Sequence, residues 1–383
     1  NIPKLRFKEF TDEWCNKKFD DLIDIKSNTY NPIKSNINYR CIELEHINQN
    51  SGTINGFINS NEQKSNKIFF KKGDVLFSKL RPYLRKYWLA EFDGVCSSEI
   101  WVAKSKNDKL INNKFIFDIF QSNYFLQLCN LSTGSKMPRA DWTFIKEQSI
   151  PIPLLNEQLK IANFLNLLDK KIELQTKKIE ALKLFKKGLF DTQLKINGKE
   201  SIMFDDFLDE VTEKSSIQNQ YPVLSSTSKG LFLQSDYFNK QASSENNVGY
   251  KILKRNQLVL SPQNLWMGNI NINNIFDIGI VSPSYRVYNI DIKKIDLNYF
   301  NYWIKTPKAL YNYLISSEQG ASIVRRNLNI EMFNQISLKI PNLEKQHIIG
   351  NKIYQFILKI NFEEEKLKQL HKLKKALLQN MFI

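Results

Sequence analysis

Few side chains of this sequence are spaced in a way that could support catalysis. An acidic-x-Lys pair of the kind found in nucleases occurs at Glu364 and Lys366, within the run EEEKLK. That run lies inside a long helical pattern, where charges three or four residues apart usually form solvated ion pairs. The tripeptide at 31–33, NPI, lacks the second proline and the aromatic residue with which adenine methyltransferases hold a flipped base. Neither motif predicts a reaction.

Motifs for phosphate, cofactor and metal binding are also missing from the sequence. It contains no GxxxxGK[ST] loop and no glycine-rich cofactor loop after a predicted strand. The three histidines, His46, His347 and His371, are far apart, and no cysteine pair has CxxC spacing. We therefore expect a non-catalytic chain with no metal site and no cofactor of its own. We expect reduced thiols at Cys15, Cys41, Cys96 and Cys129.

The charge of the chain indicates a polyanionic ligand. The 55 Lys and Arg residues outnumber the 39 Asp and Glu residues, which gives a formal net charge of +16 and a pI near 9.4. Such a field favours nucleic acid or an anionic membrane face, although a lysine-rich proteome also produces basic proteins. No apolar run reaches bilayer length and no signal peptide is visible, so we expect nucleic acid rather than membrane, and a cytoplasmic location.

The elements that must position any functional side chain form an internal repeat. Residues 158–172 read QLKIANFLNLLDKKI and residues 346–360 read QHIIGNKIYQFILKI, with apolar positions in the same rhythm 188 residues apart. Spacings of four and three in alternation are the 3.5-residue period of a coiled-coil seam. The matched seam positions are Ile161, Leu165, Leu168, Ile172, Gln175, Ile179 and Leu182 in the first copy, and Ile349, Ile353, Phe356, Ile360, Glu363, Leu367 and Leu370 in the second.

The repeat extends upstream of both helical patterns. IPIPLLNEQ at 150–158 parallels LKIPNLEKQ at 338–346, and GSKMPRAD at 134–141 parallels GASIVRRN at 320–327. Short apolar runs such as DVLFS and QLVLS, separated by Gly, Asn and Ser clusters, predict strands in both copies. The chain therefore consists of two copies of one unit, a globular part followed by a long helix.

The predicted fold is α+β, with two pseudo-repeated globular domains that each contain a mixed sheet. The expected segments are a first domain at 1–153, a first long helix at 154–196, a second domain at 197–341 and a second long helix at 342–383. The two seams are natural partners, because each must bury its apolar face. We expect an antiparallel coiled coil in which the central polar residues Gln175 and Glu363 face each other or nearly so.

Such an arrangement would suit a DNA-binding protein. Each helix of about 34 residues would span roughly 50 Å. A pseudo-two-fold axis would set two reading heads about 34 Å apart, one turn of the duplex. A coiled coil that only dimerises or scaffolds, with heads that bind something else, is the alternative.

The sequence resembles the specificity subunit of Type I restriction–modification systems over nearly its whole length. GDVLFSKLRPYL, SSEIWV, GSKMPRADW and IPIPLLNEQLKIANFL are similar to segments that recur in that family. The second half departs from the pattern, with LVLSPQNLW in place of VLFSKLRPY and EKQHIIG in place of NEQLKIA.

The resemblance implies that each globular part is a target recognition domain that reads one half of an asymmetric bipartite DNA target. The paired helices would set the spacing and carry two modification subunits, which supply S-adenosylmethionine and methylate adenine. Separate restriction subunits would supply ATP- and magnesium-dependent translocation and cleavage. A freestanding DNA-binding regulator or architectural protein with duplicated heads remains the alternative.

The candidate DNA contacts lie in loops that follow predicted strands or are rich in Gly and Ser. Arg, Asn and Gln pair bidentately with base edges, and most basic contacts in such interfaces go to phosphates. The candidates are Lys79, Arg81, Arg85, Lys86, Lys136 and Arg139 in the first copy, and Gln263, Asn264, Arg325 and Arg326 in the second.

Overall fold

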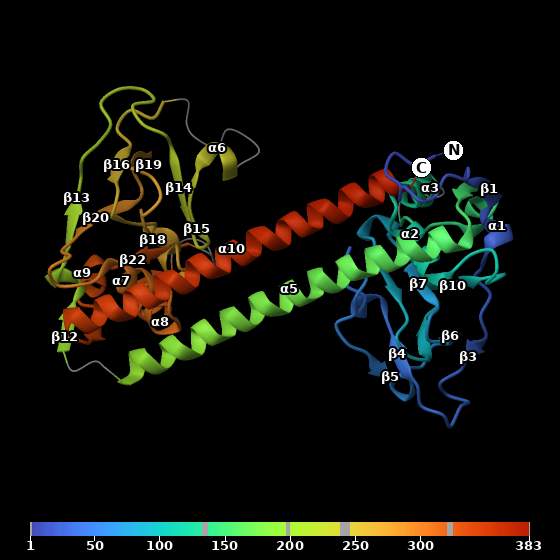
Figure 1. Ribbon diagram of the computed structural model, residues 1–383. Coiled ribbons are helices and arrows are strands. Elements are labelled where there is room, and N and C mark those ends of the chain that lie inside the picture. Colours follow the sequence, from blue (N-terminus) through green and yellow to red (C-terminus); the bar gives the residue numbers. More distant parts are fainter. Residues whose placement is uncertain (1, 132–136, 197–199, 238–245, 320–324, 383) are drawn as a thin grey trace. The chain divides into compact units, whose positions relative to one another are not determined.

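The computed structural model describes residues 2–131, 137–196, 200–237, 246–319 and 325–382, and it divides into two compact units. Unit 1 comprises Asn1–Lys177 and Glu365–Ile383, and unit 2 comprises Lys178–Glu364. Each unit thus combines one globular part with a segment of both long helices, α5 (Leu155–Ile196) and α10 (Leu343–Met381). The α+β class predicted from the sequence is confirmed (Figure 1).

The described residues of unit 1 form three sheets. The four-stranded sheet has the order β2-β10-β7-β8, the five-stranded sheet has the order β3-β6-β9-β4-β5, and β1 pairs with β11. The five-stranded sheet is mixed, because β4 and β9 are parallel while its other pairs are antiparallel. The elements are β1 (Cys15–Lys18), α1 (Phe19–Leu22), β2 (Ile23–Asp24), β3 (Thr29–Tyr30), β4 (Arg40–Ile42), η1 (Leu44–His46), β5 (Ile58–Asn59), η2 (Ser60–Glu62), β6 (Lys67–Phe70), β7 (Val75–Ser78), η3 (Pro82–Leu84), β8 (Tyr87–Leu89), β9 (Gly94–Ser97), β10 (Ile100–Ser105), α2 (Asn113–Gln121), α3 (Asn123–Leu131), α4 (Trp142–Ile145) and β11 (Ser149–Ile152).

Unit 2 repeats the central sheet of unit 1. Its four-stranded sheet has the order β13-β20-β17-β18, in which each strand takes the place of its counterpart in β2-β10-β7-β8. Likewise β12 pairs with β23 as β1 pairs with β11. The elements are β12 (Glu200–Met203), η4 (Phe204–Asp206), β13 (Leu208–Val211), β14 (Leu224–Thr227), β15 (Gly230–Leu233), α6 (Gln234–Tyr237), β16 (Lys251–Lys254), β17 (Leu258–Leu260), η5 (Pro262–Met267), β18 (Ile270–Ile272), β19 (Ile278–Val281), β20 (Arg286–Ile290), α7 (Leu297–Trp303), α8 (Pro307–Ile315), β21 (Ser317–Gln319), β22 (Arg326–Leu328), α9 (Ile330–Asn334) and β23 (Ser337–Ile340).

The apolar runs of β7 and β17 are explained by burial on both faces. Side chains alternate across a strand, so Val75 and Phe77 enter the core under α2 and α3 whereas Leu76 enters a second core. In β17, Leu258 and Leu260 enter one core and Val259 enters another. A sheet covered on both faces holds the loops at its strand ends on a rigid support.

One buried glutamine ties each long helix to its globular part. Gln158 accepts a bond from the backbone N–H of Asn112 (3.1 Å) and donates to the carbonyls of Leu110 and Pro153, both at 2.9 Å. Gln346 repeats this pattern in unit 2, since it accepts from the N–H of Asp296 (3.0 Å) and donates to Pro341 O (3.0 Å). The glutamine of the repeated NEQ and EKQ segments therefore anchors the first turn of the helix.

The second copy has an additional contact at this junction. His347 Nδ1 lies 2.7 Å from Asp296 Oδ2, and Asp296 caps α7 by accepting from the N–H of Tyr299. A Cβ added to Gly350 would lie only 2.2 Å from Asp296 Oδ1, so the backbone of α10 approaches this carboxylate closely. His347 and Gly350, which distinguish EKQHIIG from NEQLKIA, are thus the residues that meet Asp296, the acidic N-cap of α7.

Segments of α5 and α10 run antiparallel inside each unit. In unit 2, Lys178 pairs with Glu363 (2.5 Å) and Phe185 packs on Phe356 (ring centroids 5.5 Å apart). Residues further along α5 therefore contact residues earlier in α10, as in an antiparallel pair. All fourteen predicted seam residues are buried or half-buried in these helices. The coiled-coil packing itself and the facing of Gln175 and Glu363, which belong to different units, stay predictions.

The end of α10 belongs to the core of unit 1. Phe382 stacks on Phe115 of α2 with ring centroids 5.4 Å apart, and Leu5 donates its N–H to Asn380 O (2.8 Å). Lys374 Nζ lies 2.5 Å from Asp169 Oδ1 on α5. In Figure 1 the last turns of α10, in red, accordingly end beside α2 and α3 of this unit. None of the described helices is both long enough and apolar enough to span a bilayer.

Candidate nucleic-acid interface

The loop after β7 brings three of the predicted contact residues of unit 1 together. The N–H of Arg81 donates to Pro138 O (2.7 Å), and the N–H of Ala140 donates to Lys79 O (2.8 Å). These bonds hold the segment around Arg139 against the segment around Lys79 and Arg81. Segments 60 residues apart thus form one surface with three cationic side chains. The predicted contact Lys136 lies outside the described residues.

Arg81 and Arg139 are both exposed, but the structure gives their side chains different surroundings. Arg81 has a left-handed backbone (φ 50°) at the start of η3, and its side chain is exposed. Arg139 instead forms a bidentate pair with Glu99, at 3.0 and 2.9 Å, although its side chain is still 52% exposed. Lys79 is half-buried. Arg81 is therefore the residue of this loop best placed to meet a ligand.

Arg85 and Lys86 are turned away from the Arg81 loop. The η3 turn and the left-handed backbone of Arg85 (φ 49°) return the chain into β8. The guanidinium of Arg85 donates to Gln121 O (3.2 Å) and to Asn123 Oδ1 (2.5 Å). Lys86 donates to Leu44 O. The sequence grouped these two with Arg81, but the turn between them separates the two sets.

In unit 2 the corresponding loop is η5, which follows β17. Gln263 is exposed and Asn264 is half-buried. The adjacent β22 carries Arg326, whose guanidinium donates to Ser317 Oγ (3.0 Å) and Ser317 O (2.6 Å) across the β21–β22 hairpin. Arg325 is exposed and immediately precedes β22. Gln263 and Arg325 are thus accessible, while Arg326 holds the hairpin.

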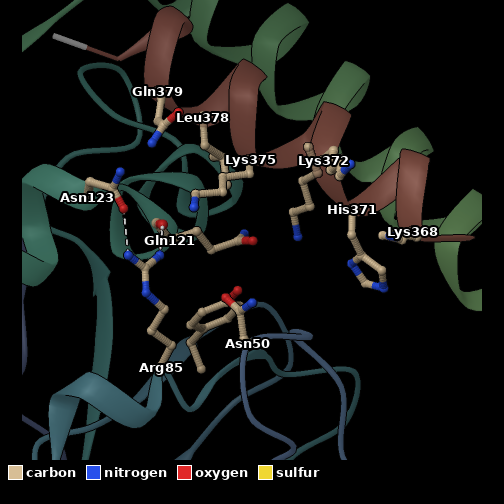
Figure 2. A pocket seen from close by; sticks show the side chains of 12 residues that line it. Asn50, Arg85, Gln121, Asn123, Lys368, His371, Lys372, Lys375, Leu378 and Gln379 are labelled. Atoms are coloured by element: carbon tan, nitrogen blue, oxygen red, sulfur yellow. Dashed lines mark hydrogen bonds between the residues drawn. The ribbon is translucent and has the colours of Figure 1, made fainter. Parts of the chain in front are cut away.

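A basic cavity of unit 1 contains residues that the sequence reasoning missed. It has a volume of about 430 Å³ and lies between the globular part and the last turns of α10 (Figure 2). The lysine spacing in KLKQLHKLKK at 366–375 is the available signal, and of its lysines only the first, Lys366, within the run EEEKLK, was considered as a site residue. The lining residues are Asn50, Arg85, Tyr87, Gln121, Asn123, Lys368, His371, Lys372, Lys374, Lys375, Leu378 and Gln379.

Burial shifts the pKa of the acidic and imidazole groups near this cavity. Burial raises the pKa of Asp118 well above its usual value, and the nearby Asp169 carboxylate adds to that shift. Burial also raises the pKa of Asp169, against the opposing charge of Lys374. Burial, and then Lys374, lower the pKa of His371. These shifts favour the protonated, uncharged carboxyl of Asp118 and the neutral imidazole of His371.

Within the described ranges, no group of His, Cys, Asp or Glu side chains is arranged to hold a metal ion. The described cysteines have free thiols, and burial raises the pKa of Cys41 and of Cys129 to about 12. These two thiols are protonated at neutral pH and are poor nucleophiles.

Comparison with known proteins identifies the repeated fold. Residues 11–184 match the family model described as the Type I restriction modification DNA specificity domain. The Type I restriction enzyme EcoDI specificity subunit of Escherichia coli is 31% identical over 170 residues. That match covers 42% of this chain and 36% of the relative, so the chain matches little more than a third of that protein's length.

Two solved structures share the fold over nearly the whole chain. The specificity subunit of a Type I restriction–modification system from M. genitalium aligns with a TM-score of 0.62 at 14% identity, covering 100% of this chain and 99% of the other. A chain from a study of assembly and conformational transition of the type I R-M system aligns with a TM-score of 0.58 at 15% identity, covering 97% and 98%. The matched segment, the similar specificity subunit and the shared fold agree: residues 11–184 match the Type I restriction modification DNA specificity domain, and the chain as a whole has the fold of the M. genitalium specificity subunit.

Proposed function

We propose that this chain is the non-catalytic, sequence-specific DNA recognition subunit of a Type I restriction–modification complex, acting in the cytoplasm. Each globular part would read one half of an asymmetric bipartite target, while the long helices set the spacing. The observation that carries this proposal is the repeated four-stranded sheet with different loops at the same place. SKLRPYLRK follows β7, and SPQNLWMGN follows β17.

Different side chains on a shared scaffold favour different base preferences. The exposed residues are Arg81 and Tyr83 in the first loop, and Gln263 and Met267 in the second. Arg81 and Gln263 lie in loops that follow the equivalent strands β7 and β17. Arginine pairs with the O6 and N7 of guanine, whereas glutamine pairs with the N6 and N7 of adenine. Two heads that present unlike groups from equivalent loops fit an asymmetric target rather than a palindrome.

Substitution of Arg81 by Ala tests the division of labour. If Arg81 touches a base, we expect a loss of about 1–3 kcal/mol confined to one position of one half-site. If it touches a phosphate, binding should weaken on all sequences and the salt slope should fall by about one. The measurement is binding or methylation by the assembled complex on single-base variants of the target.

Arg325→Ala is the matched change in the other head and should affect only the other half-site. Lys345→Ala, an exposed lysine at the start of α10, serves as a charge-matched control. Relaxed preference in both half-sites after Arg81→Ala would show that the heads are not independent readers. No change from either arginine substitution would remove these loops from the interface.

Two modification subunits are proposed as partners, with S-adenosylmethionine bound by them rather than by this chain. Restriction subunits would likewise bring ATP and magnesium. The support is a set of exposed apolar side chains on the long helices of both units, of which Leu174 and Phe362 occupy matched positions of the repeat. Leu167 and Leu174 are 65% and 67% exposed in unit 1, and Leu184 and Phe362 are 73% and 68% exposed in unit 2. Exposed apolar side chains in such numbers suit a docking surface.

We expect a saturated complex to contain two modification subunits per chain, because the junction of head and helix occurs twice. Leu174→Glu should weaken one docking event and Phe362→Glu, at the matched position, the other, each by roughly tenfold or more, since a charge would have to be desolvated. Light scattering of purified complexes at saturating partner measures the stoichiometry. One partner per chain at saturation would contradict the proposal.

A further inference from the structure

The basic cavity of unit 1 is built differently from an ordinary lysine-rich surface. Lys368, Lys372 and Lys375 follow one another at spacings of four and three, so they share one face of α10. Arg85 approaches from the opposite wall, on the globular part, as Figure 2 shows. Cationic groups from two separate elements thus converge on one cavity.

Arg85 is held in place while it keeps donors for a ligand. Its guanidinium donates to Gln121 O and Asn123 Oδ1, which fixes its plane. A guanidinium has five N–H donors, so these two bonds leave up to three for a bound group. Its backbone is also anchored, because the N–H of Asn50 donates to Arg85 O (2.9 Å). A preordered guanidinium loses little entropy on binding an anion.

The positive charge of the cavity is not cancelled by its neighbours. None of the twelve lining residues is acidic. Asp169 is matched by Lys374, whose side chain is only 10% exposed. Asp118 favours its neutral form, because burial raises its pKa. Lys368 has a weak contact with Glu365 (3.4 Å) at the rim. Arg85, Lys372 and Lys375 therefore remain as the main sources of positive potential.

The other lining groups fit a phosphate ester better than a bare carboxylate. Asn50 and Asn123 supply amide donors beside the cations, and the ring of Tyr87 and the side chain of Leu378 supply apolar wall. A volume of about 430 Å³ accommodates a phosphate together with the sugar that carries it. Phosphates are recognised by Arg and Lys together with neutral N–H donors.

The matching place in unit 2 does not carry these charges. Subtracting 188 from 368, 372 and 375 gives Glu180, Leu184 and Lys187 on α5. One of the three lysines is thus replaced by an acid and another by an apolar residue. The cavity is a feature of one head, and it is not required by the repeat.

We propose that this cavity binds a phosphate of the DNA backbone, and that it anchors the duplex beside the first head independently of base sequence. The inference rests on the proposed function, since it takes DNA as the ligand. A free nucleotide or inorganic pyrophosphate shares the same chemistry and is the alternative source of the phosphate. The site adds affinity and fixes the register of the duplex, while the Arg81 loop reads bases.

The test is a double substitution, Lys372→Gln with Lys375→Gln, in the full chain. Each lost phosphate contact should lower the salt slope by about one, so the double variant should lose about two. At 0.1 M salt this corresponds to roughly eightfold weaker binding per lysine. The probe is a 20-base-pair duplex of arbitrary sequence, titrated by fluorescence anisotropy over a range of salt concentrations. Thermal melting checks that both variants fold.

The matched control is Lys366→Gln with Lys170→Gln, which removes the same charge from exposed positions of the two long helices outside the cavity. We expect the control to change the slope by less than one. An equal fall in the control and the cavity variant would overturn the inference, because the binding would then come from a diffuse basic surface. The inference would also be overturned if the cavity variant bound DNA with the same affinity and the same salt slope as the wild type. That result would leave the proposed function standing.

A second measurement separates the two sources of phosphate. Sodium pyrophosphate should raise the melting temperature of the wild-type chain only at millimolar concentration, if DNA is the ligand. A wild-type chain that binds no DNA but is stabilised by micromolar pyrophosphate, with the gain lost in the cavity variant, would overturn the DNA assignment and the proposed function together. If the rise in melting temperature caused by pyrophosphate is lost in the cavity variant and kept in the control variant, the cavity is identified as a phosphate site.

Discussion

Replacing Gln158 by Ala should lower the free energy of unfolding by about 2–4 kcal/mol. The substitution leaves three backbone groups without the side-chain partner, namely the N–H of Asn112 and the carbonyls of Leu110 and Pro153. A buried polar group that loses its partner costs about 1–3 kcal/mol, and part of that cost is recovered where water enters. Urea denaturation of the full chain, followed by circular dichroism, measures the loss.

Gln346→Ala should have a smaller effect of the same kind, because two bonds are described for its side chain. Gln369→Ala, at an exposed position of α10, is the control and should change the stability by less than about 0.5 kcal/mol. A loss from Gln158→Ala no larger than that of the control would show that these bonds do not anchor the helix. The variant should also loosen the first turns of α5, which hydrogen exchange would detect.

Replacing Lys374 by Met should destabilise the chain in a pH-dependent manner, by about 2–3 kcal/mol at pH 8. Lys374 and Asp169 form a largely buried ion pair, and removal of one partner leaves the other charge buried without compensation. Methionine keeps most of the apolar stem, so that the charge is the main loss. Denaturation at several pH values measures the effect.

The sign of the pH dependence follows from Asp169. Its pKa in the folded chain is already raised by burial, and Lys374 opposes that shift, so the substitution should raise it further. A carboxyl whose folded pKa lies above its unfolded value destabilises the fold above the folded pKa, and this penalty disappears as the pH falls towards the unfolded value. The loss caused by Lys374→Met should therefore be large at pH 8 and small near pH 4.

Lys366→Met removes the same charge from an exposed position of α10 and should show little loss at either pH. An equal loss from Lys374→Met at pH 8 and pH 4 would show that packing, rather than the buried Asp169 charge, accounts for the effect.

The long helices and the repeat could be predicted from the sequence because both are local patterns. The apolar spacing of four and three needs no knowledge of the partner, and it repeats over Ile161–Leu182 and Ile349–Leu370. The α+β class followed in the same way, since DVLFS and QLVLS are continuous apolar runs that suit strands buried on both faces. The family resemblance rested on these same segments.

The sides on which cationic residues lie could not be predicted in this way. Arg81 and Arg85 are four residues apart in one basic stretch, yet one side chain is exposed on the loop after β7 and the other lines the basic cavity. The cause is η3, with a left-handed residue at each of its ends, which reverses the chain between them. Left-handed backbone at arginine is uncommon, and the sequence carries no signal for it.

The sequence by itself determined that the chain has two similar heads, two long helices and a basic character, because composition and periodicity are properties of neighbouring residues. Only the tertiary structure decided that the last turns of α10 complete the core of unit 1, through Phe382 on Phe115 and Lys374 on Asp169. Those contacts join residues more than 200 positions apart. They depend on which apolar faces meet after the chain has folded, and a local pattern does not specify that choice.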